Sequence, residues 1–230
     1  MKNVLDAELL GEKLMKISEM FGKKSAFILS DMNSPLGRTV GNWLEVVESV
    51  HCLKGVVVPD LMEVTYELAG MMLTMGGKSA DIKSGIEMAK ESVSSGRAYN
   101  KFLEMVEIQG GDTSYIENLE KQAIPKRAVS VEAPKGGFIH GIDAMKIGLA
   151  GLEIGVGRKL SSDNIDPLSG IVFKKLIGDE VSEGEELAVI YSGKDIEMKN
   201  VKELVRTSFC IEKSVIEKQT KLISRYGNCY

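Results

Sequence analysis

The chain has 230 residues, which is enough for one large domain or two modest ones. An apolar fraction of 43% and a charged fraction of 27% are ordinary for a globular protein. The net charge of -4 and the absence of a Lys/Arg run argue against a nucleic-acid partner. No apolar stretch approaches the roughly 20 residues that a membrane span needs.

The cysteines and histidines narrow the class of protein further. Cys52, Cys210 and Cys229 are widely spaced and form no CxxC pair, which indicates reduced thiols in a cytoplasmic protein. The first residues lack the apolar core of a signal peptide. His51 and His140 are the only histidines, so the sequence offers few ligands for a zinc site and few candidates for the base of a catalytic triad.

The first 120 or so residues are predicted to be mostly helical. Residues 6–22 form a helix whose apolar side chains share one face, and Gly22 ends it; these side chains are Leu10, Leu14, Ile17 and Phe21. A short buried strand is expected over 25–30 and a helix over 38–53. Two further helices begin near Pro59 and Ile82, and a third contains Phe102, Leu103 and Val106. One strand among so many helices suggests the last βα portion of a sheet whose earlier strands lie elsewhere.

The pattern changes after Pro125. Strands are expected over 128–131, 138–140, 170–173 and 186–191, and helices over 144–156 and 196–206. The last 20 or so residues are too mixed to assign. We place a domain boundary near residues 120–126, which divides the chain into domains at 1–122 and 123–230.

The stretch SDMNSPLGRTVGN, Ser30 to Asn42, joins the first strand to the next helix through a Pro-Leu-Gly turn. Asp31 can act as a base, a metal ligand or a capping group, and capping is the commoner role at such a position. Glu45 and Glu48 share one flank of the helix. They form a solvated face, or one of them turns back to join backbone carbonyls around a hard cation such as K⁺, Na⁺, Ca²⁺ or Mg²⁺.

Three other features carry weaker signals. The segment Gly155–Asp166 contains Gly-x-Gly but lacks the third glycine of a dinucleotide-binding loop, and it follows a helix. The segment 170–191 is similar to the hairpin of biotinyl and lipoyl carriers. Lys174 and Lys175 lack the flanks of a modification site, so an unmodified barrel-sandwich is favoured. His51 near a helix end suits a dipole or capping role.

The motifs from Ser30 to Gly55, Glu107 to Asp112 (EIQGGD) and Ala133 to Tyr191 closely resemble the pyrimidine-nucleoside phosphorylase and thymidine phosphorylase family. The resemblance implies an α/β fold, in which the C-terminal part of an α/β nucleoside phosphorylase domain is followed by an α+β barrel-sandwich-like domain. It implies a cytoplasmic, dimeric pentosyltransferase that converts a pyrimidine nucleoside and phosphate into the free base and a pentose 1-phosphate. Positioning and electrostatics supply most of that chemistry.

The resemblance covers only the C-terminal portion of the family's enzymes. The helical domain, the phosphate loop and the base-contacting residues have no counterpart here, so no catalytic or substrate-binding residue is assigned. The resemblance does imply one set of ligands in this chain, because the family binds a monovalent cation, taken as K⁺. Its ligands match Leu36 and Thr39 by backbone oxygen and Glu48 by side chain, and the remaining ligands belong to the upstream segment.

We therefore expect a phosphorylase segment that is inactive without the N-terminal portion. Phosphate and nucleoside are partners of the complete enzyme, with no nucleic acid and no membrane. The alternative is a non-catalytic fold remnant or partner-binding module, because an unpaired sheet edge invites pairing. A carrier of biotinyl or lipoyl groups is disfavoured.

Overall fold

The computed structural model describes residues 3–119, 125, 127–216 and 220–227. These residues fold into two compact units that interleave along the sequence. The first unit contains 1–31, 53–100 and 220–230, and the second contains 32–52 and 101–219. The predicted domain boundary at 120–126 falls almost wholly outside the described residues, and it stays a prediction.

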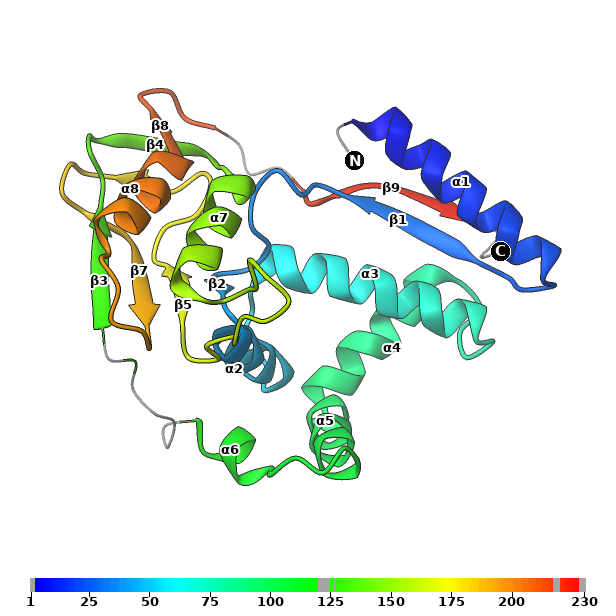
Figure 1. Cartoon of the computed structure of the whole chain (residues 1–230). Helices are drawn as coiled ribbons and strands as arrows, with labels where there is room; N and C mark the ends of the chain where they lie inside the picture. Colours follow the sequence, from blue (N-terminus) through cyan, green and yellow to red (C-terminus); the bar gives the residue numbers. More distant parts are fainter. Residues whose placement is uncertain (1–2, 120–124, 126, 217–219, 228–230) are drawn as a thin grey trace. The chain divides into compact units, whose positions relative to one another are not determined.

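The first unit is built on a two-stranded sheet (Figure 1). β1 (Ala26–Ser30) pairs antiparallel with β9 (Leu222–Gly227), and Phe27 stacks on Tyr226 with ring centroids 4.7 Å apart. β1 confirms the strand expected over 25–30, although its residues are half-buried instead of buried. β9 lies in the C-terminal segment that the sequence pattern left unassigned. Among the described strands it pairs with β1, which is nearly 200 residues away along the chain.

Three helices complete the first unit: α1 (Val4–Met20), α3 (Pro59–Met75) and α4 (Ile82–Ser94). All three confirm the predicted helices to within a few residues. α3 and α4 approach closely through glycine, since a Cβ on Gly85 would lie 2.6 Å from the carbonyl oxygen of Gly70. Asp81 caps the start of α4 by accepting a hydrogen bond from the Ser84 N–H at 2.7 Å.

The apolar face predicted for α1 does not point into the unit. A Cβ on Gly11 would clash with the Phe27 ring, so α1 rests on the sheet through Gly11. The four side chains of the predicted face are instead exposed: Leu10, Leu14, Ile17 and Phe21. Periodicity identified the face correctly, but it could not identify what covers that face.

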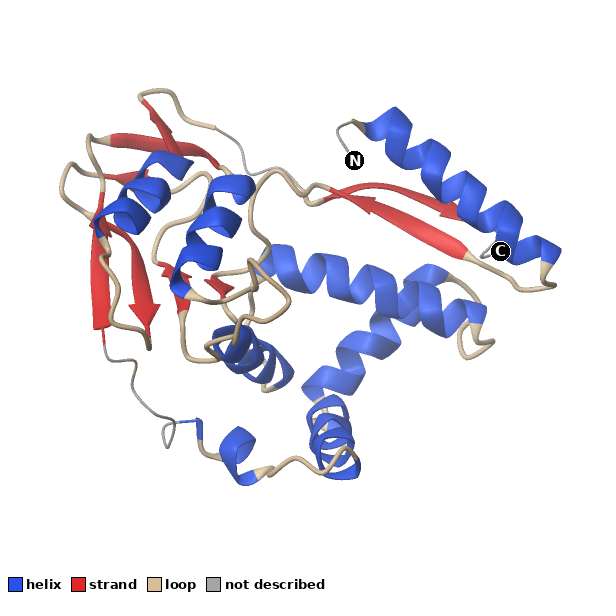
Figure 2. Cartoon of the chain, in the orientation of Figure 1, coloured by secondary structure: helices blue, strands red, loops and turns tan. Residues whose placement is uncertain are grey.

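The second unit contains two antiparallel sheets (Figure 2). The larger has the order β2 (Thr39–Val40), β5 (Gly170–Phe173), β7 (Glu186–Ser192) and β3 (Arg127–Glu132). The smaller has the order β6 (Glu180–Val181), β4 (Gly137–Ile142) and β8 (Phe209–Glu212). The strands expected over 128–131, 138–140, 170–173 and 186–191 are all confirmed.

The helices of the second unit are α2 (Asn42–Leu53), α6 (Ser114–Glu117), α7 (Ala144–Ile154) and α8 (Lys199–Ser208). α5 (Arg97–Ile108) crosses from the first unit into the second. The prediction that one helix runs over 38–53 is wrong at its start. Thr39 and Val40 pair with Val172 and Ile171 as a short strand, and α2 begins only at Asn42.

The main hydrophobic core lies in the second unit. Leu187, Ala188 and Ile190 of β7 are fully buried, as expected for a strand with neighbours on both edges. The core joins both sheets to α7 and α8; its largest fully buried members also include Phe173, Ile139, Ile147, Ile154, Ile171, Val131 and Val205. In the part of the chain that is described, no helix is long and apolar enough to cross a membrane.

The connection between β5 and β7 shows where the two hairpin lysines lie. The Lys174 and Lys175 N–H groups both donate to the carbonyl of Leu187, at 2.8 and 3.2 Å. The Lys175 ammonium pairs with Glu185 at 2.5 Å, and its side chain is only 25% exposed. The backbone of both lysines and the side chain of Lys175 therefore support the turn.

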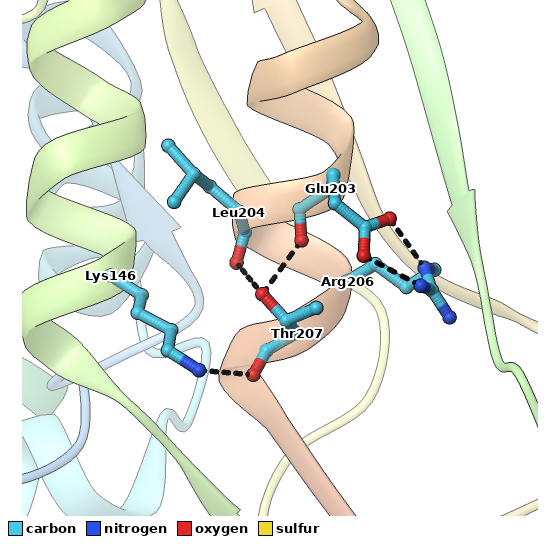
Figure 3. A network of polar contacts seen from close by, with 5 residues as sticks. All are labelled: Lys146, Glu203, Leu204, Arg206 and Thr207. Atoms are coloured by element: carbon cyan, nitrogen blue, oxygen red, sulfur yellow. Dashed lines mark hydrogen bonds and ion pairs between the residues drawn. The ribbon is translucent and has the colours of Figure 1, made fainter.

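A polar network joins α7 to the end of α8 (Figure 3). The Lys146 ammonium on α7 donates to the Thr207 carbonyl at 2.8 Å, and the Thr207 hydroxyl donates to the carbonyl of Glu203. Arg206 makes two hydrogen bonds to the carboxylate of Glu203 on the exposed side of α8. Lys146 thus places a positive charge at the carbonyl end of a helix, where the helix dipole favours it.

We expect Lys146→Met to lower the free energy of unfolding by about 1 kcal/mol, because the variant loses a charge-assisted hydrogen bond while keeping the apolar stem. Urea unfolding followed by circular dichroism measures the change. The matched control is Lys159→Met, which removes an ion pair to Glu153 between two half-exposed side chains. It should cost less than half as much. Equal losses in the two variants would contradict the role given to Lys146.

Candidate functional site

The turn before α2 is organised around the side chain of Glu48. This carboxylate is only 7% exposed. Its Oε1 accepts a hydrogen bond from the Arg38 N–H at 2.7 Å, and its Oε2 accepts one from the Thr39 hydroxyl at 2.9 Å. Gly37 has φ +77°, and a Cβ there would lie 2.6 Å from Oε2. Glycine at position 37 therefore allows the turn to close over the carboxylate.

Glu48 has this position because the start of α2 is tied to distant segments. The Trp43 N–H donates to the Pro167 carbonyl at 3.1 Å, and the Asn42 amide donates to the Val156 carbonyl at 2.9 Å. Glu45 accepts a hydrogen bond from the Gly41 N–H at 3.0 Å. Glu45 thus acts at the helix start, while Glu48 turns back to the loop, so the two carboxylates have different roles.

The pairing of β2 with β5 determines the direction in which the Thr39 carbonyl points. The Arg38 carbonyl accepts a hydrogen bond from the Phe173 N–H at 2.8 Å, and Thr39 lies opposite Val172. Successive residues of an antiparallel strand direct their N–H and C=O groups to opposite edges. The Thr39 carbonyl therefore points away from β5, toward the edge of the sheet.

The three residues carried over as cation ligands thus lie on one turn and the helix that follows it. Thr39 and Glu48 are in direct contact, and Leu36 immediately precedes Gly37 in the turn. Arg38 and Thr39 use two of the roughly four lone-pair positions on the Glu48 carboxylate. Cation binding by Leu36, Thr39 and Glu48 stays a prediction.

The sequence did not reveal the parts played by Arg38 and Glu45. Arg38 contributes through its backbone N–H, which side-chain patterns do not reveal, and the pattern of Glu45 indicates only that it shares a helix flank with Glu48. The usable signal was the four-residue spacing from Gly41 to Glu45, which suits a carboxylate that reaches back to the helix start.

Asp31, the acidic residue that directly follows β1, has a structural role. Its N–H donates to the Lys221 carbonyl at 2.7 Å, and its carboxylate lies 3.5 Å from the Lys221 ammonium. Lys221 is itself buried. Asp31 therefore extends the β1–β9 pair by one residue, as expected for a group that ends a strand.

The Gly-x-Gly segment after α7 is a closed turn. The carboxylate of Asp163 accepts hydrogen bonds from the N–H groups of Leu160 and Lys159, at 2.9 and 3.0 Å. The bond from Leu160, followed by that from Lys159, lowers the pKa of Asp163 below its usual value. These N–H groups are already used, so they are not free to hold a phosphate group.

His140 lies beside a serine and a glutamate, but the arrangement is not a catalytic triad. Its Nε2 lies 2.6 Å from the Ser214 carbonyl and 3.4 Å from the Ser214 hydroxyl, and its Nδ1 lies 3.8 Å from Glu212. A carbonyl can only accept, so Nε2 must carry the hydrogen. It therefore cannot take a proton from the serine hydroxyl. Neither Cys210 nearby nor the buried Cys52 forms a disulfide within the described residues.

Two family models match the chain, one in its N-terminal part and one in its C-terminal part. The first is described as "Glycosyl transferase family, a/b domain" and matches residues 4–99. The second is described as "Pyrimidine nucleoside phosphorylase C-terminal domain" and matches residues 138–212. The second match covers most of the core of the second unit.

Curated relatives agree with these models. Pyrimidine-nucleoside phosphorylases of Staphylococcus aureus, from strains USA300 and COL, are each 36% identical over 194 residues. The alignment covers 84% of this chain and 45% of each relative, so the chain spans about half the length of the relatives that it matches. The chain belongs to the pyrimidine-nucleoside phosphorylase family, of which it represents roughly the C-terminal half.

Proposed function

We propose that this chain is the C-terminal portion of a pyrimidine-nucleoside phosphorylase. The complete enzyme would cleave a pyrimidine nucleoside with phosphate and release the free base and a pentose 1-phosphate. The observation that carries the proposal is the 36% identity to the Staphylococcus aureus phosphorylases over 84% of the chain. The complete enzyme would be a cytoplasmic homodimer, as the family resemblance implies.

In this proposal the 230 residues do not catalyse the reaction alone. The relatives are about twice as long as their match to this chain. The family resemblance implies that the residues holding phosphate and the base belong to the part outside that match. Phosphorolysis depends on cations and amide donors that hold phosphate beside the nucleoside. A polypeptide without those groups should bind neither substrate in a productive arrangement.

We further propose that the turn before α2 forms part of a monovalent cation site, taken as K⁺. The ligands would be the carbonyls of Leu36 and Thr39 and the carboxylate of Glu48, with other oxygens from the N-terminal portion. Two features support this. Within the described residues, the Arg38 N–H and the Thr39 hydroxyl that donate to the buried Glu48 are both uncharged groups, and strand pairing directs the Thr39 carbonyl away from β5. A bound cation would supply a fixed positive charge at this turn.

The proposed function is tested by phosphorolysis of uridine and thymidine, read out as release of uracil or thymine. The purified chain alone should give no phosphate-dependent release. Co-expression with the N-terminal half of the Staphylococcus aureus relative should restore it. Clear turnover by the 230-residue chain alone would contradict the proposed dependence on the N-terminal half.

A second candidate function is a non-catalytic module that binds a partner, which the exposed apolar face of α1 favours. Under this alternative, co-expression would yield a complex that never releases base. Release of base by the complex would exclude it.

A further inference from the structure

A single carboxylate organises the segment that leads from α7 to β5. Asp166 Oδ1 accepts a hydrogen bond from the Leu168 N–H at 3.0 Å, and Oδ2 accepts one from the Ser169 hydroxyl at 2.7 Å. The Asp166 N–H donates to the Gly155 carbonyl at 2.8 Å, at the end of α7. Asp166 therefore ties the end of α7 to the residues that directly precede β5.

The end of β7 holds the same carboxylate from another direction. Ser169 is fully buried, and its hydroxyl oxygen accepts a hydrogen bond from the Gly193 N–H at 3.1 Å. A Cβ at Gly193 would lie 2.3 Å from Asp166 Oδ2. Glycine at position 193 thus leaves the space that the carboxylate occupies, and a larger residue would displace it.

The Leu168 N–H belongs to the same peptide plane as the Pro167 carbonyl. No cis peptide bond occurs among the described residues, so the N–H and C=O of this plane point in opposite directions. The N–H points to Asp166, and the carbonyl accepts a hydrogen bond from the Trp43 N–H at 3.1 Å. By fixing one side of the plane, Asp166 also fixes the direction of the other side.

The Trp43 N–H needs an acceptor outside its own helix. α2 begins one residue before Trp43, and its helical hydrogen bonding opens with the Glu45 N–H, which donates to the Gly41 carbonyl. N–H groups ahead of such a bond have no acceptor within the helix. The Pro167 carbonyl supplies one, so a segment more than 100 residues away places the start of α2. Glu48 lies five residues further along the same helix.

We propose that Asp166 is a positioning residue for the candidate cation site. Its carboxylate fixes the Pro167–Leu168 peptide plane, the plane fixes the start of α2, and α2 carries the Glu48 carboxylate that accepts a hydrogen bond from Thr39. All of these residues lie in the second unit. The last step rests on the proposed function, in which Glu48 is a cation ligand. The steps before it concern hydrogen bonds that can be measured in the 230-residue chain.

The first experiment measures hydrogen exchange at the Trp43 amide in the 230-residue chain by NMR. Trp43 is the single tryptophan, so isotope labelling of tryptophan gives one backbone amide signal. An added isoleucine label lets Ile190, fully buried in the middle of β7, report any global loss of stability. Relative to Ile190, exchange at Trp43 should be about tenfold faster in Asp166→Ala than in wild type, as expected when one hydrogen bond is lost locally.

Two variants separate the position of the carboxylate from its charge. Asp163→Ala makes the same change in net charge and also frees two backbone N–H groups. It should leave exchange at Trp43 within about threefold of wild type, because those groups belong to a separate turn. Asp166→Asn keeps the side-chain size and an oxygen that can accept from the Leu168 N–H, so it should restore slow exchange.

Gly193→Ala tests the same contact without removing the carboxylate. The added methyl group should displace Asp166 from Ser169 and speed exchange at Trp43. Combined with Asp166→Ala, it should give no further increase, because both substitutions act through one contact. Additive effects of the two substitutions would contradict this route.

The second experiment measures base release against K⁺ concentration in the complex with the N-terminal half of the Staphylococcus aureus relative. The Asp166→Ala complex should need about tenfold more K⁺ for half-maximal release, whereas the Asp163→Ala complex should match wild type. An unchanged K⁺ requirement in Asp166→Ala would overturn the step from α2 to the cation site. A wild-type complex that releases no base would count against the proposed function, and exchange at Trp43 would still decide the role of Asp166.

Two exchange results would overturn the inference. In the first, Trp43 exchanges as slowly in Asp166→Ala as in wild type, relative to Ile190. In the second, Asp163→Ala speeds that exchange as much as Asp166→Ala does, and the effect then belongs to a general loosening of the loop.

Discussion

Gly41→Ala is expected to lower the free energy of unfolding of the second unit by about 3 kcal/mol, the sum of backbone strain and overpacking. Gly41 has φ +141°, and a Cβ there would lie 2.5 Å from the Ser169 carbonyl oxygen. Gly170 on the facing strand is equally close, because its Cβ would lie 2.4 Å from the Val40 carbonyl oxygen. Both clashes are with backbone atoms, so no side-chain movement relieves them.

The measurement is urea unfolding followed by the fluorescence of Trp43, the single tryptophan, which lies two residues from the substitution. The matched control is Gly148→Ala. Nothing lies within 4 Å of a Cβ at Gly148, which sits inside helix α7, so alanine there should stabilise the protein by about 0.5–1 kcal/mol. A Gly41→Ala variant as stable as wild type would show that β2 and β5 do not approach this closely.

Glu48→Ala is expected to cost about 2–4 kcal/mol of unfolding free energy, because it leaves the Arg38 N–H and the Thr39 hydroxyl without their acceptor. Glu48→Gln keeps the side-chain size and an acceptor oxygen, and it should cost about 1 kcal/mol or less. The same unfolding assay measures both. Equal losses for the alanine and glutamine variants would argue that hydrogen bonding to the turn is not what Glu48 supplies.

The glutamine variant also tests the cation proposal, since it removes the charge and largely keeps the turn. The test uses a chimera that carries the N-terminal half of the Staphylococcus aureus relative directly ahead of this chain. In this chimera, replacing K⁺ by tetramethylammonium should lower the melting temperature of wild type. The same replacement should have little effect on Glu48→Gln. A shift of equal size in both proteins would assign the salt effect to another site.

The helices with strong local signals were predictable from the sequence. α3 and α4 begin at Pro59 and after the capping Asp81, and both follow an apolar period close to that of a helix. Those features depend only on neighbouring residues. The strands β3, β5 and β7 were also found, because each is a short apolar run between turn residues.

Features that depend on distant partners were not predictable. β2 is two residues long and exists through its pairing with β5, more than 100 residues later. The helical pattern from Val40 to Val50 therefore suggested a helix that began too early. β9 likewise gains its structure from β1. Single-sequence patterns contain no information about such pairings.

Residue spacing left the roles of Glu45 and Glu48 open, and the family resemblance singled out Glu48 as part of the candidate site. Spacing alone favoured a solvated Glu48, whereas the structure buries it in the turn. The resemblance named Thr39 and Glu48 together, and their side chains are in contact. The opposite outcome holds for α1, where periodicity identified an apolar face that the described fold leaves exposed.

We propose that these residues form a working C-terminal portion of a phosphorylase that needs an N-terminal half. The most direct measurement is phosphate-dependent release of uracil or thymine by the chimera, beside the 230-residue chain at equal concentration. We expect multiple turnovers by the chimera and none by the chain alone. A correctly folded chimera that releases no base, or a chain that turns over alone, would contradict it.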